Sequence, residues 1–294
     1  MTIPSGSILA TAFVSGVLLG GLLVVTALGL SLVFGVMRLV NLAHGELVIL
    51  GAYLALELSR HGGLDPLLTI PVVAAVLFAI AVPVHRVLLE PLMSRGPEPA
   101  LLTTFALSVI AQNLFILIWS GDTQALQGSY VTSSVTVAGI RVPMTHLISF
   151  GCALVLAAAV HLLLQRTSLG RQIRASSEDA AAASVLGVNV ARVHMFVFGL
   201  AAACAAIGGV LVGITFDFTP TTGITYLISG FAVVVLGGLG SVKGTLLGAI
   251  GLGVTENVGA AFFGDSYRDL IGFAAFLIVL SLRPQGLFGR VLPR

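Results

Sequence analysis

The sequence predicts an all-α protein, a polytopic bundle of transmembrane helices, and three observations lead to this prediction. Lys, Arg, Asp and Glu make up only 9% of the 294 residues, against roughly 25% in soluble domains. Hydrophobic residues reach 57%, and the mean hydropathy is +1.09. The apolar runs do not alternate as barrel strands do, so each must satisfy its backbone groups as a helix. A soluble globular protein is excluded, and the formal net charge of +2 argues against a nucleic-acid partner.

Nine hydrophobic segments are candidate membrane spans, since about 20 mostly apolar residues are needed to cross the hydrocarbon core. Some are short, so the sequence is compatible with eight to ten spans in one transmembrane domain over residues 1–294. The nine segments are 8–34, 44–58, 67–89, 101–119, 144–164, 193–214, 225–242, 245–263 and 270–282.

The positions of Lys and Arg predict that the N-terminus is outside and the C-terminus cytoplasmic, because basic residues stay on the cytoplasmic side. In this orientation only Arg60, Arg141 and Arg268 are external. The cytoplasmic basic residues are then Arg38, Arg86, Arg95, Arg166, Arg171, Arg174, Arg192, Lys243, Arg283, Arg290 and Arg294.

Two connecting segments are long enough for a role of their own. The external segment 120–143 alternates Val with Thr, Ser or Ile around Ala138–Gly139, which predicts a small β-hairpin. It is either a solvated hairpin or a docking surface. The second segment, 165–192, is cytoplasmic.

The cytoplasmic segment predicts a short capped helix. Ser176 and Asp179 resemble a capping box, Glu178 and Asp179 favour the positive end of the helix dipole, and Gly187 supplies a stop. Such a helix is either a rigid lever on which a partner pushes or a juxtamembrane helix that rests on the lipid headgroups.

Two glycine-containing breaks interrupt the apolar sequence, one in each half of the chain. Residues 34–55 place Arg38, Asn41, His44 and Glu46 within nine residues, and residues 236–253 combine glycines with Lys243. The first break is either a cytoplasmic turn or a helix interrupted near the bilayer. Paired breaks in two halves indicate a transport path, because unwound backbone is tolerated in a membrane only where it lines a cavity or is buried in protein.

Polar residues within the spans are candidates for that path or for bonds between helices. Thr104, Ser108 and Gln112 recur every four residues, and an acid such as Glu256 is costly inside a membrane. The candidates for the translocation path are Asn41, His44, Glu46, Thr104, Ser108, Gln112, Asn113, Glu256 and Asn257.

A seam of small residues precedes Glu256. Gly240, Gly244, Gly248 and Gly251 recur at three- or four-residue spacing, which predicts close packing of another helix. The same stretch does not form a phosphate-binding loop, because Lys243 precedes the last glycine of the pattern instead of following it.

No catalytic motif and no metal-ligand spacing is evident, so we predict neither an enzyme nor a metal site. Any energy for active transport must then come from an ion gradient or from another subunit. An ion-coupled secondary transporter or channel is one alternative, with Glu256 as its natural ion site.

Four stretches, taken together and in order, resemble the permease subunits of branched-chain amino-acid ABC importers, the first permease of that system more than the second. They are Gly29–Tyr53, Leu169–Val193, Gly237–Ala249 and Arg283–Gly289. Permeases for urea and short-chain amides are close relatives, so the resemblance leaves the substrate open.

This resemblance implies a multi-pass protein of the bacterial inner membrane that binds no cofactor itself. Its expected partners are the lipid bilayer, a second related permease, two cytoplasmic ATPases that use ATP, and an external substrate-binding protein. Residues 178–187 resemble the coupling helix that docks on the ATPase, with Ala182, Ala183 and Gly187 in the family's pattern and Ala181 where glutamate is common.

Overall fold

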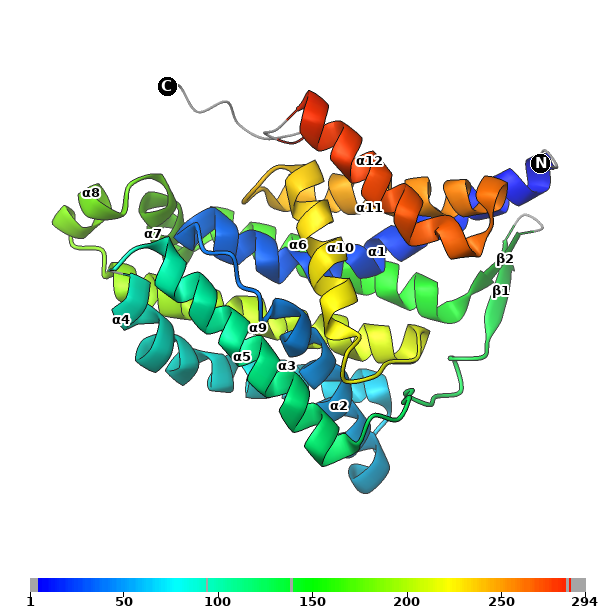
Figure 1. Cartoon of the computed structure of the whole chain (residues 1–294), viewed down its shortest axis with the longest axis horizontal. Helices are drawn as coiled ribbons and strands as arrows, with labels where there is room; N and C mark the ends of the chain where they lie inside the picture. Colours follow the sequence, from blue (N-terminus) through cyan, green and yellow to red (C-terminus); the bar gives the residue numbers. More distant parts are fainter. Residues whose placement is uncertain (1–4, 94, 138–139, 284–285, 287–294) are drawn as a thin grey trace.

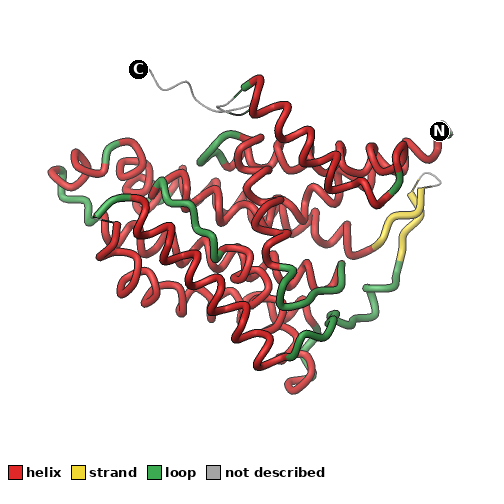
Figure 2. The backbone as a smooth tube through the Cα atoms, in the orientation of Figure 1, coloured by secondary structure: helices red, strands yellow, loops and turns green. Residues whose placement is uncertain are grey.

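The computed structural model describes residues 5–93, 95–137, 140–283 and 286 and is almost entirely helical (Figures 1 and 2). The basic residues Arg290 and Arg294 and most of the final motif lie outside this range. The helices are α1 (Gly6–Met37), α2 (His44–Gly62), α3 (Pro66–Val84), α4 (Glu90–Met93), α5 (Pro97–Trp119), α6 (Met144–Arg166), α7 (Ser168–Glu178), α8 (Ala180–Val185), α9 (Val190–Thr215), α10 (Gly223–Gly237), α11 (Val242–Phe263) and α12 (Arg268–Leu282).

Each of the nine predicted segments falls largely on a helix, although the segment 225–242 runs past the end of α10 at Gly237 and across a turn to the first residue of α11. Within the described residues, six helices are long and apolar enough to cross a membrane by length and composition: Gly6–Met37, Pro66–Met93, Glu98–Trp119, Met144–Arg166, Val190–Thr215 and Val242–Phe263. The second of these joins α3 to α4 through a π-helical turn, η1 (His85–Leu89), just after Pro83. Helices α2, α10 and α12 do not meet that criterion. The first turns of α2 and α10 contribute to the candidate functional site.

Helices α1 and α9 form the centre of the bundle, and their most apolar windows are 78% and 72% buried. Helix α1 packs against α6, α9, α10 and α11, while α9 also contacts α2 and α3 (Figure 1). Close packing here depends on glycine, because a Cβ on Gly16 would lie 2.7 Å from the main-chain oxygen of Gly253 in α11. By contrast, α5 is only 11% buried in its apolar window and lies at the surface of the bundle.

The predicted hairpin is confirmed. Strands β1 (Ser134–Val137) and β2 (Ile140–Pro143) pair antiparallel, with Val135 opposite Val142. The two turn residues, 138 and 139, lie outside the described range. The hairpin lies beside the first turns of α1 (Figure 1), so the segment 120–143 and the start of α1 are at the same end of the molecule.

Most glycines of the seam lie close to neighbouring backbone. Gly244 and Gly248 face Gly237 of α10, since a Cβ on Gly248 would lie 2.7 Å from the nitrogen of Gly237, and Gly240 lies in a turn against Gly35 of α1. Gly251 makes no such approach, because a Cβ there would meet no described atom within 4 Å apart from the adjoining backbone of its own helix. The next glycine on the helix, Gly253, makes the contact with α1 instead.

Candidate functional site

The first break is an interrupted helix whose chain folds back beside α1. Helix α1 ends at Met37, its C-cap residue Arg38 has a φ of 51°, and α2 begins at His44. Nε2 of His44 lies 2.7 Å from the main-chain oxygen of Thr26. Because Thr26 is eleven residues before the end of α1, the start of α2 lies about 16 Å back along that helix. Six extended residues can cover about 20 Å, so residues 38–43 form a re-entrant connection.

A second re-entrant connection, residues 216–222, leads from α9 into α10. It starts near the 120–143 segment, where Phe218 and Gln124 form an isolated antiparallel bridge, and the ring of Phe218 lies 5.0 Å from that of Tyr53 in α2. It ends at Gly223, which contacts Gly45. Tyr53 lies eight residues beyond Gly45 on α2. The connection therefore runs about 12 Å alongside α2, from the level of Tyr53 back to Gly45.

The N-termini of α2 and α10 therefore meet inside the bundle, and from there the two helices run in opposite directions (Figure 1). The contact is backbone to backbone, since a Cβ on Gly45 would collide with the carbonyl group of Gly223. Each helix N-terminus carries a partial positive charge and unpaired N–H groups. Two such ends in one place make a region suited to negative charge.

A buried carboxylate occupies this region. Glu46, in the first turn of α2, is 4% exposed, and a Cβ on Gly223 would lie 2.9 Å from its Oε2 atom. The hydroxyl of Ser108 in α5 donates to Oε1 at 3.3 Å. Oε2 is buried and has no hydrogen-bond partner among the described residues. An ionised carboxylate accepts about four hydrogen bonds, so Glu46 is under-satisfied.

The connection 38–43 is held in place by α5. The hydroxyl of Thr104 accepts from the backbone N–H of Leu42 at 3.2 Å and donates to Leu101 of its own helix at 2.9 Å. Oδ1 of Asn41 accepts from the N–H of Ala43 at 3.1 Å. Thr104 and Asn41 are at most 1% exposed, so polar side chains and not water satisfy these groups of the unwound backbone.

Five of the predicted path residues thus come together: Asn41, His44, Glu46, Thr104 and Ser108. We call them the break cluster. They come from the first break, the start of α2 and one face of α5. Two members of the site were missed, Thr26 and Gly223, because neither a threonine in an apolar helix nor a lone glycine carries a local signal of its own.

The remaining four candidates lie elsewhere. Gln112 is half-buried further along α5, and Asn113 is exposed and bonds to Val109 of its own helix at 2.8 Å. On α11, Asn257 is buried and donates to the oxygen of Gly253 at 2.8 Å, whereas Glu256 packs against Gly272 of α12. The structure does not bring them to the break cluster.

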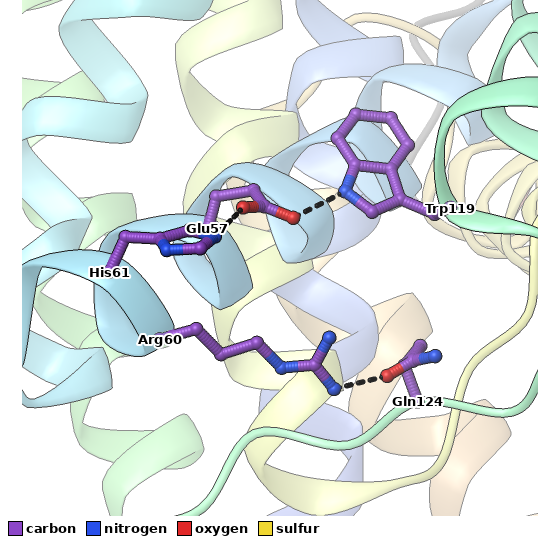
Figure 3. A network of polar contacts seen from close by, with 5 residues as sticks. All are labelled: Glu57, Arg60, His61, Trp119 and Gln124. Carbon is purple, nitrogen blue, oxygen red and sulfur yellow. Dashed lines mark hydrogen bonds and ion pairs between the residues drawn. The ribbon is translucent and has the colours of Figure 1, made fainter.

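A polar network fixes the far end of α2 (Figure 3). The indole N–H of Trp119 donates to Oε1 of Glu57 at 2.7 Å, and His61 lies 3.1 Å from the other oxygen of that carboxylate. Arg60 donates to Oε1 of Gln124 at 2.5 Å. The network joins α2 to the end of α5 and to the segment 120–143.

Beside this network lies a cavity of about 550 Å³, lined by the α2–α3 turn and residues 125–127. Its lining includes Arg60 and Asp65. Oδ1 of Asp65 caps α3 by accepting from the N–H of Leu67 and also accepts from the hydroxyl of Tyr130 at 3.0 Å. Burial, reinforced by this hydrogen bond, raises the pKa of Tyr130, so its hydroxyl stays protonated and keeps donating above neutral pH.

The segment 165–192 contains two helices instead of the one predicted. Thr167 caps α7, and Ser176 lies buried within it, so the predicted start at Ser176 is wrong. Asp179 is itself the cap of α8, with Oδ1 accepting from the N–H groups of Ala181 at 2.9 Å and Ala182 at 3.0 Å. The predicted stop is confirmed, because Gly187 follows α8 with a φ of 86°.

Helix α8 presents an apolar tip on a firmly held base. In α7, Ile173 is 2% exposed, and Arg174 donates to the main-chain oxygen of Leu164 at the end of α6. Val185 and Leu186 at the end of α8 are 86% and 82% exposed. The sequence signal for this tip was two large apolar residues directly before the terminating glycine. Glu178, Asp179, Ala182 and Gly187 are exposed beside it, whereas Ala183 is buried.

Comparison with known proteins identifies a family model that matches residues 12–280, described as branched-chain amino acid transport system / permease component. The chain is 32% identical to the high-affinity branched-chain amino acid transport system permease protein BraD of Pseudomonas aeruginosa, over 94% of both chains. It is 29% identical to LivH of Salmonella typhimurium, also over 94% of both chains. It is 29% identical to LivM of the same organism, covering 92% of this chain and 68% of LivM. No solved structure matches it.

Proposed function

The chain belongs to the family of branched-chain amino acid transport permeases, and on this premise we propose that it is a permease subunit of an ATP-driven importer for branched-chain amino acids. It forms half of the translocation path in a bacterial inner membrane, and a second, related permease forms the other half. The similarity to both LivH and LivM, two branched-chain amino acid permeases of one organism, supports such a pair.

The observation that carries the proposal is the meeting of α2 and α10 at the break cluster. Two re-entrant connections that enter from opposite ends of the bundle bring helix N-termini and a buried carboxylate together. Transporters form substrate sites from interrupted helices of this kind. A purely structural bundle gains nothing from a buried and under-satisfied acid, which costs free energy inside a membrane.

Energy for transport comes from partner subunits in this proposal. Two cytoplasmic ATPases hydrolyse ATP and move α8, and an external binding protein delivers the amino acid at the end of the bundle that holds the segment 120–143. The apolar tip of α8 suits insertion into a groove of a partner, because Val185 and Leu186 bury little surface within this chain. The hydrogen bond from Arg174 in α7 to the main-chain oxygen of Leu164 in α6 makes α7 a stiff connection from α8 to the bundle.

The test is reconstitution of the permease pair with its ATPases and binding protein in liposomes. We expect leucine-stimulated ATP hydrolysis and ATP-dependent uptake of leucine. Glu178→Lys is expected to abolish the stimulation, and it is a cleaner charge reversal than one at Asp179, which would also remove the cap of α8. Gly187→Pro is expected to have the same effect, because proline cannot adopt the positive φ found there.

The same preparation separates the alternatives. An ion-coupled transporter or channel would move solute without the ATPases, in response to a gradient, and Glu256→Gln would then block it. A urea or short-chain amide permease would show ATP-dependent uptake of those solutes but not of leucine. Either result would overturn the proposal.

A further inference from the structure

Glu46 lacks the partner that its chemistry requires. The salt bridges within the described residues are His61–Glu57 and Arg268–Asp265, so neither involves Glu46. Its only described hydrogen bond, from Ser108, is long at 3.3 Å, and Oε2 has no partner among the described residues. A buried carboxylate without a counter-charge is costly. The missing group is therefore a hydrogen-bond donor, best a cationic one, at Oε2.

His44 adds a second free acceptor in the same turn. The main-chain oxygen of Thr26 can only accept a hydrogen bond, so Nε2 of His44 must carry the proton that lies between them. In the neutral ring Nδ1 is then an acceptor. It is buried and has no partner among the described residues.

The backbone around these two acceptors supplies hydrogen-bond donors and partial positive charge. The first turn of α10 faces Glu46 through Gly223, and no side chain caps that helix. Its free N–H groups and those of α2 can bind a carboxylate, as helix N-termini do elsewhere. The carboxylate of Glu46 and the neutral acceptor Nδ1 of His44 thus lie beside positive helix ends, an arrangement complementary to a molecule whose positive and negative groups are attached to the same carbon atom.

We propose that Glu46 binds the ammonium group of the transported amino acid, while the N-termini of α2 and α10 bind its carboxylate. The inference rests on the proposed function and extends it by naming the recognised group. Gly45 and Gly223 are in contact in this structure, so the site opens when the two helix starts separate. A neutral amide or urea has neither charge, and the site therefore selects zwitterions.

The primary test uses the complete reconstituted importer with its binding protein. Glu46→Gln keeps the size of the side chain and the acceptor for Ser108 but removes the charge. We expect its maximal rate of leucine uptake to fall at least about ten-fold, the value of a charge-assisted hydrogen bond. The half-saturating leucine concentration, set by the binding protein, should stay unchanged. Glu46→Asp, which retains the charge, should transport faster than Glu46→Gln.

The matched control is Glu57→Gln, the same change about three turns further along α2. It keeps an acceptor for Trp119 and should transport like the wild type. If Glu46→Gln also transports like the wild type, the inference is wrong, whereas failure of the wild-type complex to take up leucine would overturn the proposed function instead.

A second measurement separates recognition from a purely structural role. Dicyclohexylcarbodiimide modifies buried carboxyl groups, and mass spectrometry locates the adduct on the wild-type complex. During turnover with leucine and ATP, we expect slower modification of Glu46 and unchanged modification of Glu57. Equal rates at Glu46 with and without leucine would show that the amino acid does not reach this carboxylate.

Discussion

Nε2 of His44 lies 2.7 Å from the main-chain oxygen of Thr26, and this contact fixes the start of α2 against the middle of α1. It holds the end of the re-entrant connection 38–43 that leads into α2 about three turns back along α1. The positions of Asn41 and Glu46 depend on it, because both lie within three residues of His44.

We therefore predict that His44→Ala destabilises the permease by about 2–4 kcal/mol, since it removes a buried hydrogen bond and leaves a cavity. The measurement is thermal unfolding of the purified permease pair in detergent. His61→Ala is the control, because the side chain of His61 is 81% exposed. Equal losses of stability in both variants would contradict a special role for the contact.

The contact between the two helix starts predicts a strong effect of the smallest possible substitution. Gly45→Ala places a methyl group against the carbonyl group of Gly223, and backbone cannot move aside as a flexible side chain can. We expect a loss of about 1–3 kcal/mol and a lower rate of uptake. Gly151→Ala in α6, where a Cβ would meet no described atom within 4 Å, should be neutral or slightly stabilising. A harmless Gly45→Ala would mean that the helix starts are loosely packed.

The exposed tip of α8 predicts a loss of coupling without a loss of folding. Val185→Asp with Leu186→Asp should change thermal stability by less than about 0.5 kcal/mol, because both side chains are already exposed. Binding of the ATPase subunits, measured by co-purification, should be lost. Ser184→Asp, on the same short helix, tests whether charge alone is responsible. Retention of the ATPases by the double variant would refute the docking role of the tip.

Trp119 is the only tryptophan in the chain, so its fluorescence reports on the network of Figure 3. Its ring stacks on Tyr53 at 4.4 Å, and its N–H donates to Glu57. Glu57→Ala removes the acceptor and should shift the emission, whereas Glu57→Gln, which keeps an acceptor, should shift it much less. Identical spectra for the two variants would show that the hydrogen bond does not form in solution.

Local sequence signals predicted much of the fold. Apolar runs of sufficient length located all nine helical segments, and alternation located the hairpin 134–143. The break between Arg38 and Glu46 was recognised from four polar residues in an apolar stretch, and five path residues proved to be neighbours. These features depend on residues close together in the chain, where hydrophobicity and periodicity act directly.

The features that were missed depend on contacts between distant residues. Nothing near Gly223 indicates that it faces Glu46, because their contact exists only once α10 has packed against α2. The helix cap within the segment 165–192 was misassigned for a related reason. Ser176 and Asp179 are both suitable caps, and burial of Ser176 in α7 leaves Asp179 to start α8.

The position of α1 at the centre of the bundle has a consequence for biosynthesis. This helix is made first, yet the helices that cover it include α9, α10 and α11, all of which begin at residue 190 or later. At about 5–20 residues per second, translation from the end of α1 to the end of α11 takes roughly 10–45 s. During that interval, the face of α1 that later packs against α9, α10 and α11 can contact only lipid or the insertion machinery. Because α1 is rich in leucine and valine, it is stable in lipid on its own. It can therefore remain inserted until the later helices pack around it.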